Sequence, residues 1–107
     1  MSDRIFHLAL ASDWEEARAS GVYAVSTLGR TLEDEGFVHA SRADQWVGVR
    51  ERFYAEATEP LVLLTVDRSR LVAEVRDEAV PGLDETFPHI YGPINLDAVV
   101  ETRLLGQ

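Results

Sequence analysis

Three histidines are the residues of this sequence whose type and surroundings best suit chemistry. His7, His39 and His89 each lie in a short apolar run, and the chain has no other histidine. A buried imidazole needs hydrogen-bond partners, so three imidazoles in apolar segments favour one shared polar pocket. We therefore expect the three side chains to line a single cleft. The alternative is that each is a separate core histidine bonded to the backbone.

Imidazole titrates near neutral pH, so a shared cleft would suit acid–base catalysis or hydrogen bonding to a substrate. We predict that His39 and His89 are catalytic acid–base groups and that His7 binds the ligand. Three neutral imidazoles could instead hold the metal ion of a hydrolase. The spacing does not favour this alternative, because the chain has neither an HxH nor an HExxH motif. We therefore assign no metal ligand.

Two segments could bind an anionic group. Ser41 and Arg42 are predicted to begin a helix directly after a strand, where free amides and the helix dipole favour negative charge. Arg30 lies in residues 26–31, which add hydroxyl groups and a glycine. We predict that Ser41 and Arg30 bind the ligand's anionic group. Alternatively, Ser41 and Thr31 are only helix caps.

Other polar side chains carry weaker signals. We place Tyr91 beside the cleft as a ligand-binding residue, although a tyrosine before Gly-Pro can also cover the edge of a core. The adjacent carboxylates of residues 33–35 are expected to decorate a helical turn and to point in different directions. Asp84 and Glu85 precede His89, where either could orient an imidazole or stay a solvated charge.

The composition limits the remaining chemistry. The 107 residues include 19 acidic and 10 basic residues, all of them Arg, for a formal net charge of -9. Without Cys and Lys, the chain has no thiolate nucleophile, no Cys-type zinc site, no Schiff-base lysine and no P-loop lysine. The acidic balance argues against binding a nucleic-acid duplex, since that affinity comes mainly from basic side chains. The net charge does not exclude the binding of a small anionic ligand in a local pocket.

Length and hydropathy predict one soluble domain over residues 1–107. Hydrophobic residues make up 46% of the chain, which is typical of a globular protein. No apolar run approaches the roughly 18 residues that a membrane span needs. Charged residues in positions 1–10 argue against a signal peptide, so we expect a cytoplasmic protein. No feature predicts the oligomeric state.

Short strands and helices must position these residues. Capping boxes predict helices beginning at Ser12 and Ser41, the first ending at Gly21 and the second near residue 57. Thr31 is predicted to cap a single turn that ends at Gly36. Residues 80–93 hold three Pro and two Gly, which predicts a long loop with at most one short strand. This irregular mixture favours the α+β class. Strands are predicted at residues 5–10, 22–26, 37–40, 61–67, 71–76 and 98–105.

The segments IFHLAL, VSTLGRTLEDEGFVHAS and FPHIYGPINLDAVV resemble a small bacterial family known as domain of unknown function 952. The match follows the family's order and spacing over most of the chain. The resemblance carries no established activity. It implies a fold similar to that of ADP-ribosyltransferases and RNA 2'-phosphotransferases, in which two small, roughly perpendicular sheets and short helices surround an NAD-type cleft.

The resemblance also implies roles by position. His7 matches the place of a residue that holds the nicotinamide ribose, and Ser41 lies at a neighbouring strand end. A catalytic Glu would be expected before the final strand, where this chain has His89, Tyr91 and Asn95 instead. The missing Glu argues against ordinary ADP-ribosyl transfer. The phosphotransferase-like enzymes use His and Arg, which leaves other nucleotide chemistry open.

We therefore expect a protein that binds a nucleotide or other phosphate-bearing metabolite in a histidine-lined cleft. If it is an enzyme, it would be a transferase or hydrolase acting at a ribose or phosphate centre. NAD or a related nucleotide is expected as a ligand, with no cofactor assigned. Two alternatives stay open: a non-catalytic binding or interaction module on the same fold, which the missing Glu favours, and a His-dependent metal hydrolase.

Overall fold

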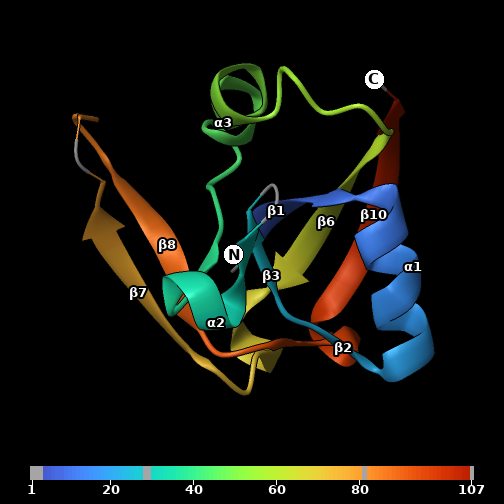
Figure 1. The fold of residues 1–107 in the computed structure, drawn as a ribbon. Coiled ribbons are helices and arrows are strands. Elements are labelled where there is room, and N and C mark those ends of the chain that lie inside the picture. The colour runs from blue at the N-terminus through green and yellow to red at the C-terminus, as the bar shows by residue number, and fades with distance from the viewer. Residues whose placement is uncertain (1–3, 28–29, 81, 107) are drawn as a thin grey trace.

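The computed structural model describes three segments of the chain, residues 4–27, 30–80 and 82–106. An antiparallel three-stranded sheet is the main element (Figure 1). Its middle strand is β6 (Leu61–Asp67), which pairs with β1 (Arg4–Leu10) and β10 (Val99–Gly106). The continuous Leu and Val run of β6 is buried, because apolar groups cover both of its faces. The strand predicted at residues 61–67 is confirmed.

A second antiparallel sheet carries two of the three histidines. Its order is β5 (Val38–His39), β8 (Thr86–Tyr91) and β7 (Glu74–Ala79). β7 begins and ends three residues later than predicted. Residues 80–93 were predicted to form a long loop with at most one short strand. β8 is that strand, and it forms the centre of this sheet.

Shorter elements connect the two sheets. Two-stranded ribbons pair β2 with β9 and β3 with β4. Among the described helices, none is long and apolar enough to cross a membrane. The bounds are β2 (Val22–Tyr23), β3 (Val25–Thr27), β4 (Arg30–Thr31), β9 (Ile94–Asn95), α1 (Ala11–Ser20), α2 (Leu32–Glu35), α3 (Trp46–Phe53), η1 (Arg68–Arg70) and η2 (Leu96–Ala98). The α+β class is confirmed.

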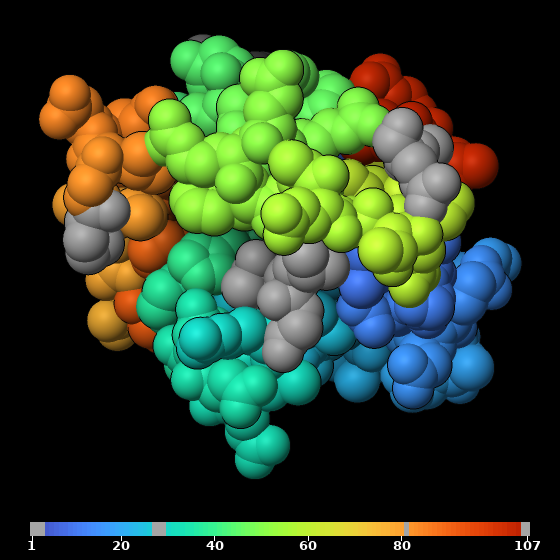
Figure 2. Space-filling model, turned by 45° about the horizontal axis from the view of Figure 1, so that its top comes forward, coloured from blue at the N-terminus to red at the C-terminus, as the bar shows by residue number. Residues whose placement is uncertain are grey.

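The central sheet separates two apolar cores, because successive strand residues face opposite sides. Ile5 and Ala9 of β1 belong to the larger core, which also contains residues of α1 and of the second sheet. Leu8 faces the smaller core, where the side chains of α3 and its flanking segments pack. Figure 2 shows the α3 segment covering the molecule between the β7–β8 hairpin and β10.

The first predicted helix is present, but its start is different. α1 begins at Ala11, directly after Leu10, and no side chain caps it. Ser12 therefore lies inside the first turn, and its amide donates a hydrogen bond of 2.9 Å to Glu59. The predicted capping box at Ser12 is wrong. The predicted end at Gly21 is confirmed, since this residue has a φ of 95°, which suits glycine.

The predicted helix start at Ser41 is also wrong. The backbone of Ser41 exchanges two hydrogen bonds of 2.7 Å with Phe6, which hold it extended beside β1. α3 begins only at Trp46 and ends at Phe53, short of residue 57. The Gln45 side chain accepts from the amide of Arg42 at 2.9 Å in the intervening turn.

The predicted turn after Thr31 is confirmed. The Thr31 hydroxyl accepts from the Asp34 amide at 3.3 Å, and the Asp34 carboxylate accepts from the Thr31 amide at 3.1 Å. Gly36, with a φ of 87°, ends α2. This reciprocal cap fixes the position of Glu35, the last residue of the helix.

Candidate functional site

Strand pairing places His39 and His89 side by side. They are direct partners in the register of β5 and β8. Their ring centroids are 5.3 Å apart, and the ring planes are nearly perpendicular. Phe37 stacks on His89 with centroids 4.1 Å apart and contacts His39 edge to face at 4.8 Å. The two imidazoles, which are 50 residues apart in the sequence, therefore form one aromatic group, called the His pair below.

His7 reaches this region through the backbone of β5. Its Nδ1–H donates to the carbonyl oxygen of His39, and its Nε2 accepts from the Tyr23 hydroxyl at 2.9 Å. Burial lowers the pKa of His7 to about 4, so the ring is neutral at pH 7. Burial raises the pKa of Tyr23, which therefore keeps its proton and acts as the donor. Both ring nitrogens of His7 are thus engaged within the protein.

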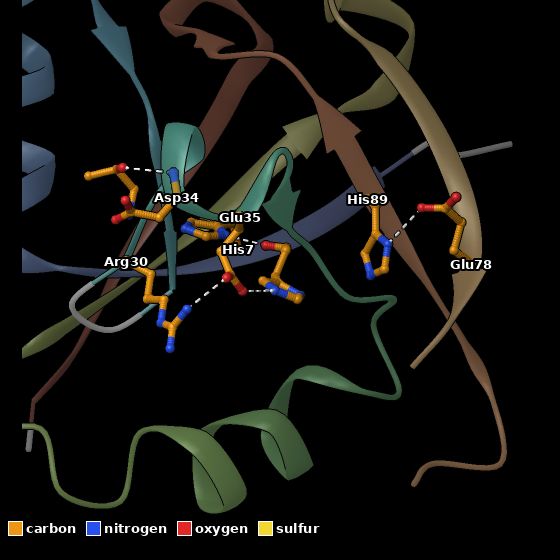
Figure 3. A network of polar contacts seen from close by, with 8 residues as sticks. His7, Arg30, Asp34, Glu35, Glu78 and His89 are labelled. Carbon is orange, nitrogen blue, oxygen red and sulfur yellow. Dashed lines mark hydrogen bonds and ion pairs between the residues drawn. The ribbon is translucent and has the colours of Figure 1, made fainter. Parts of the chain in front are cut away.

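Glu35 holds the His39 imidazole. Its Oε1 lies 3.4 Å from His39 Nε2, and its Oε2 lies 3.1 Å from the Arg30 guanidinium (Figure 3). His39 is half-buried, and this burial lowers its pKa, with a further contribution from nearby His89. The hydrogen bond to Glu35 acts in the opposite direction. His39 is therefore a neutral, carboxylate-bound imidazole near pH 7.

Glu78 holds the second imidazole. Its Oε1 accepts from the Tyr91 hydroxyl and from His89 Nδ1 at 2.9 Å, the second of which Figure 3 shows. These two bonds lower the pKa of Glu78. The Arg76 guanidinium lies over the Tyr91 ring, 4.7 Å from its centroid. His89 Nε2 is buried and has no hydrogen-bond partner among the described residues.

A pocket of about 260 Å³ opens beside His39, and we call it the His39 pocket. Its polar end and its apolar wall come from different elements. The wall is supplied mainly by β1, by α3 with the residue after it, and by the segment between β7 and β8. The lining residues with polar side-chain groups are His7, Glu35, His39, Ser41 and Tyr54, and the others are Phe6, Leu8, Ala40, Val49, Phe53, Val80, Leu83 and Phe87.

The structure divides the six residues predicted for the site into two groups. The pocket is lined by His7, His39 and Ser41, and of these only His39 has a ring nitrogen without a described protein bond. The residues of the second group are not part of its lining; they are His89, Arg30 and Tyr91. Residues 28 and 29 of the predicted anion-binding segment lie outside the described residues.

Sequence reasoning did not identify the two carboxylates that contact the histidines, Glu35 and Glu78. Glu35 and His39 lie four residues apart, but they meet because Gly36 turns the chain from α2 into β5. Glu78 meets His89 only through the β7–β8 register, which pairs Arg76 with His89 and puts Glu78 two residues further along the same face. No local motif signals either contact, because neither partner's position follows from helical or strand spacing alone.

Of the two alternatives for Asp84 and Glu85, the solvated charge fits the structure, and no contact of either with a histidine is found among the described residues. Asp84 and Glu85 are exposed. Glu85 accepts from the Gln45 side chain at 2.6 Å. Within the described segments, no group of three or more His, Cys, Asp or Glu side chains is arranged to hold a metal ion. The metal-hydrolase alternative therefore has no ligand set in this part of the chain.

These observations define a small α+β domain whose paired, carboxylate-bound histidines stand beside a largely apolar pocket. The chain belongs to the family described as "Protein of unknown function (DUF952)", whose model matches residues 8–102. The predicted resemblance is confirmed.

Solved structures of one other protein have the same fold. The crystal structure of protein CC0527 from Caulobacter crescentus has a TM-score of 0.80 and 25% identity, and the match covers 94% of this chain and 84% of that chain. Its solution NMR structure gives a TM-score of 0.77 at 25% identity, covering 97% and 85%. Among curated proteins, none matches this sequence significantly. The family description and the names of these structures state no activity.

Proposed function

We propose that this protein binds a nucleotide or related metabolite in the His39 pocket and acts on it as a transferase or hydrolase at a ribose or phosphate centre. One observation carries the proposal. His39 is half-buried at the polar end of an otherwise apolar pocket, with the Glu35 carboxylate on its Nε2. A titratable group of this kind in a mostly apolar pocket is the arrangement expected of a ligand site.

The bond to Glu35 suits His39 to act as a base. With Nε2–H donated to the carboxylate, the lone pair lies on Nδ1, and the lowered pKa keeps that lone pair free at pH 7. Nδ1 would take the proton of an attacking hydroxyl or water while its oxygen bonds to the ribose carbon or to phosphorus. The leaving group departs with the electron pair of the broken bond, and Glu35 stabilises the imidazolium.

The dimensions of the pocket favour part of a nucleotide over a whole dinucleotide. Pockets for drug-sized ligands span roughly 300–1,000 Å³, and this one has about 260 Å³. The proposed ADP-ribosyltransferase-like architecture rests on the sequence resemblance and on the two small sheets. In this proposal His7 positions β5, since its nitrogens are occupied. Glu35 supplies a carboxylate from a different place in the chain than the resemblance implies.

A ligand screen tests the proposal. We expect NAD, ADP-ribose or a ribonucleotide to raise the Tm, because a ligand that binds only the native state stabilises it. His39→Gln should reduce this shift, and Val72→Ala should keep it, since Val72 is 88% exposed and does not line the pocket. Product formation is followed by mass spectrometry on the same mixtures.

Three outcomes have different meanings. A Tm shift with turnover, both reduced in His39→Gln, supports the proposed function. A shift without turnover in any mixture supports the alternative of a non-catalytic binding module. No shift with any probe at saturating concentration contradicts a nucleotide site.

A further inference from the structure

The polar end of the His39 pocket mostly presents hydrogen-bond acceptors. The Glu35 carboxylate is an acceptor only, and the bond between its Oε1 and His39 Nε2 leaves His39 with an acceptor at Nδ1. His7 lines the pocket, but both of its nitrogens are already bonded. Of the remaining lining residues, Ser41 and Tyr54 have hydroxyls that can both donate and accept. A ligand group that matches this end must therefore bring O–H or N–H donors.

Two arginines whose neighbours or partners line the pocket, Arg30 and Arg42, are engaged elsewhere. Arg30 is ion-paired with Glu35 at 3.1 Å and is not part of the lining. Arg42 follows the lining residue Ser41, but its guanidinium donates to the Thr86 carbonyl at 3.0 Å and lies 3.6 Å from Glu85. Among the residues that the structure describes, the pocket lining contains no Arg. Its one carboxylate faces no cation inside the pocket.

This charge pattern disfavours an anion inside the pocket. A phosphate group there would lose its hydration against an apolar wall, with no buried cation in compensation. It would also lie close to Glu35, and like charges repel strongly at short range in a poorly solvated site. At neutral pH a phosphate ester offers mainly acceptors, which do not match the acceptors at the polar end.

We propose that the His39 pocket selects an uncharged or cationic group with an apolar ring and hydroxyl or amino donors, and that it excludes phosphate. The inference rests on the proposed function and reverses the anionic ligand expected from the sequence. For a nucleotide, the base and sugar enter the pocket and the phosphate stays outside. Of the two reaction centres proposed above, this leaves the ribose.

Matched pairs of ligands test the inference on the full chain. Calorimetry compares adenosine and cytidine with their 2'- and 3'-monophosphates. We expect each nucleoside to bind at least about tenfold more tightly than its monophosphates. Glu35→Gln should lower the ratio, because it removes the like charge while the loss of phosphate hydration remains. Glu33→Gln is the matched control, because it removes the same charge from an exposed position of α2 that does not line the pocket.

Circular dichroism and urea unfolding first establish that both variants fold. A nucleoside preference that Glu35→Gln reduces and Glu33→Gln keeps supports the inference. Monophosphates that bind the wild type as tightly as nucleosides do, or more tightly, overturn it and leave the proposed function intact. A preference that Glu35→Gln leaves unchanged overturns the role of this carboxylate. If no probe binds, the proposed function fails and the inference fails with it.

Discussion

Glu78 Oε1 lies 2.9 Å from His89 Nδ1, and this contact decides which nitrogen of His89 carries the proton. The same carboxylate oxygen accepts from the Tyr91 hydroxyl, so Nδ1 must be a donor. In the neutral ring, Nε2 then has a lone pair that is buried and unpartnered among the described residues. Glu78 is thus a positioning residue for a buried, carboxylate-bound imidazole.

Glu78→Gln should weaken this control over the tautomer of His89. A glutamine amide can donate as well as accept, so the Nε2–H tautomer becomes accessible. At a pH high enough to keep the ring neutral, we expect the imidazole ¹⁵N shifts of His89 to show an unprotonated Nε2 in the wild type and a mixture in the variant. Glu74→Gln changes an exposed carboxylate of the same strand and should leave the shifts unchanged. Identical His89 shifts in Glu78→Gln would disprove the positioning role.

His7→Phe should lower the free energy of unfolding by about 2–4 kcal/mol, because it leaves the His39 carbonyl and the Tyr23 hydroxyl without their partner. Tyr23→Phe removes only the second bond and should lower it by about 1–3 kcal/mol. Urea unfolding at pH 7.5 measures both values. If His7→Phe is no less stable than Tyr23→Phe, the bond to β5 contributes little.

Acid should destabilise the protein while most carboxylates are still ionised. The pKa of His7 falls from its ordinary 6.5 to about 4 on folding, so the unfolded chain binds the extra proton between these values. The stability associated with neutral His7 is complete above pH 6.5 and decreases as the pH falls towards 4. The whole decrease is about 3 kcal/mol. The lowered pKa of His39 has the same sign.

Urea unfolding between pH 7.5 and 4.5 measures this slope in the wild type and in His7→Phe. The wild type should lose stability more steeply, because the variant lacks the titrating ring. Carboxylates with lowered pKa values, such as Glu78, act mainly at still lower pH. Parallel slopes in the two proteins would show that His7 is not the titrating group.

Two glycine substitutions should have opposite effects. A Cβ on Gly92 would lie 2.7 Å from the Ala73 Cβ, so Gly92→Ala should destabilise the protein by about 1–3 kcal/mol. Gly48 lies in α3 with open space around it, so Gly48→Ala should stabilise it by about 0.5–1 kcal/mol. Thermal unfolding measures both. The double variant Ala73→Gly with Gly92→Ala should recover part of the loss, and a lack of recovery would place the strain elsewhere.

Local signals in the sequence were sufficient for several elements. The Leu and Val run of β6, the reciprocal cap of Thr31 and Asp34 and the ends of α1 and α2 at Gly21 and Gly36 are as predicted. These features depend on interactions between residues a few positions apart, so the local sequence pattern is sufficient to predict them. We expected all three histidines to line one cleft; His39 and His89 are adjacent, but of the three only His7 and His39 line the pocket.

The sequence by itself determined which groups are available: no Cys or Lys, three histidines in apolar segments, and the α+β pattern of the family. Only the tertiary structure decided how they are used. Ser41 has the signal of a helix cap, a bond worth about 1 kcal/mol. Pairing with Phe6 overrides that signal, because it satisfies two backbone groups at the edge of a buried sheet. Likewise, the contacts of Glu35 and Glu78 with their histidines arise from a turn and a strand register, which the whole fold sets.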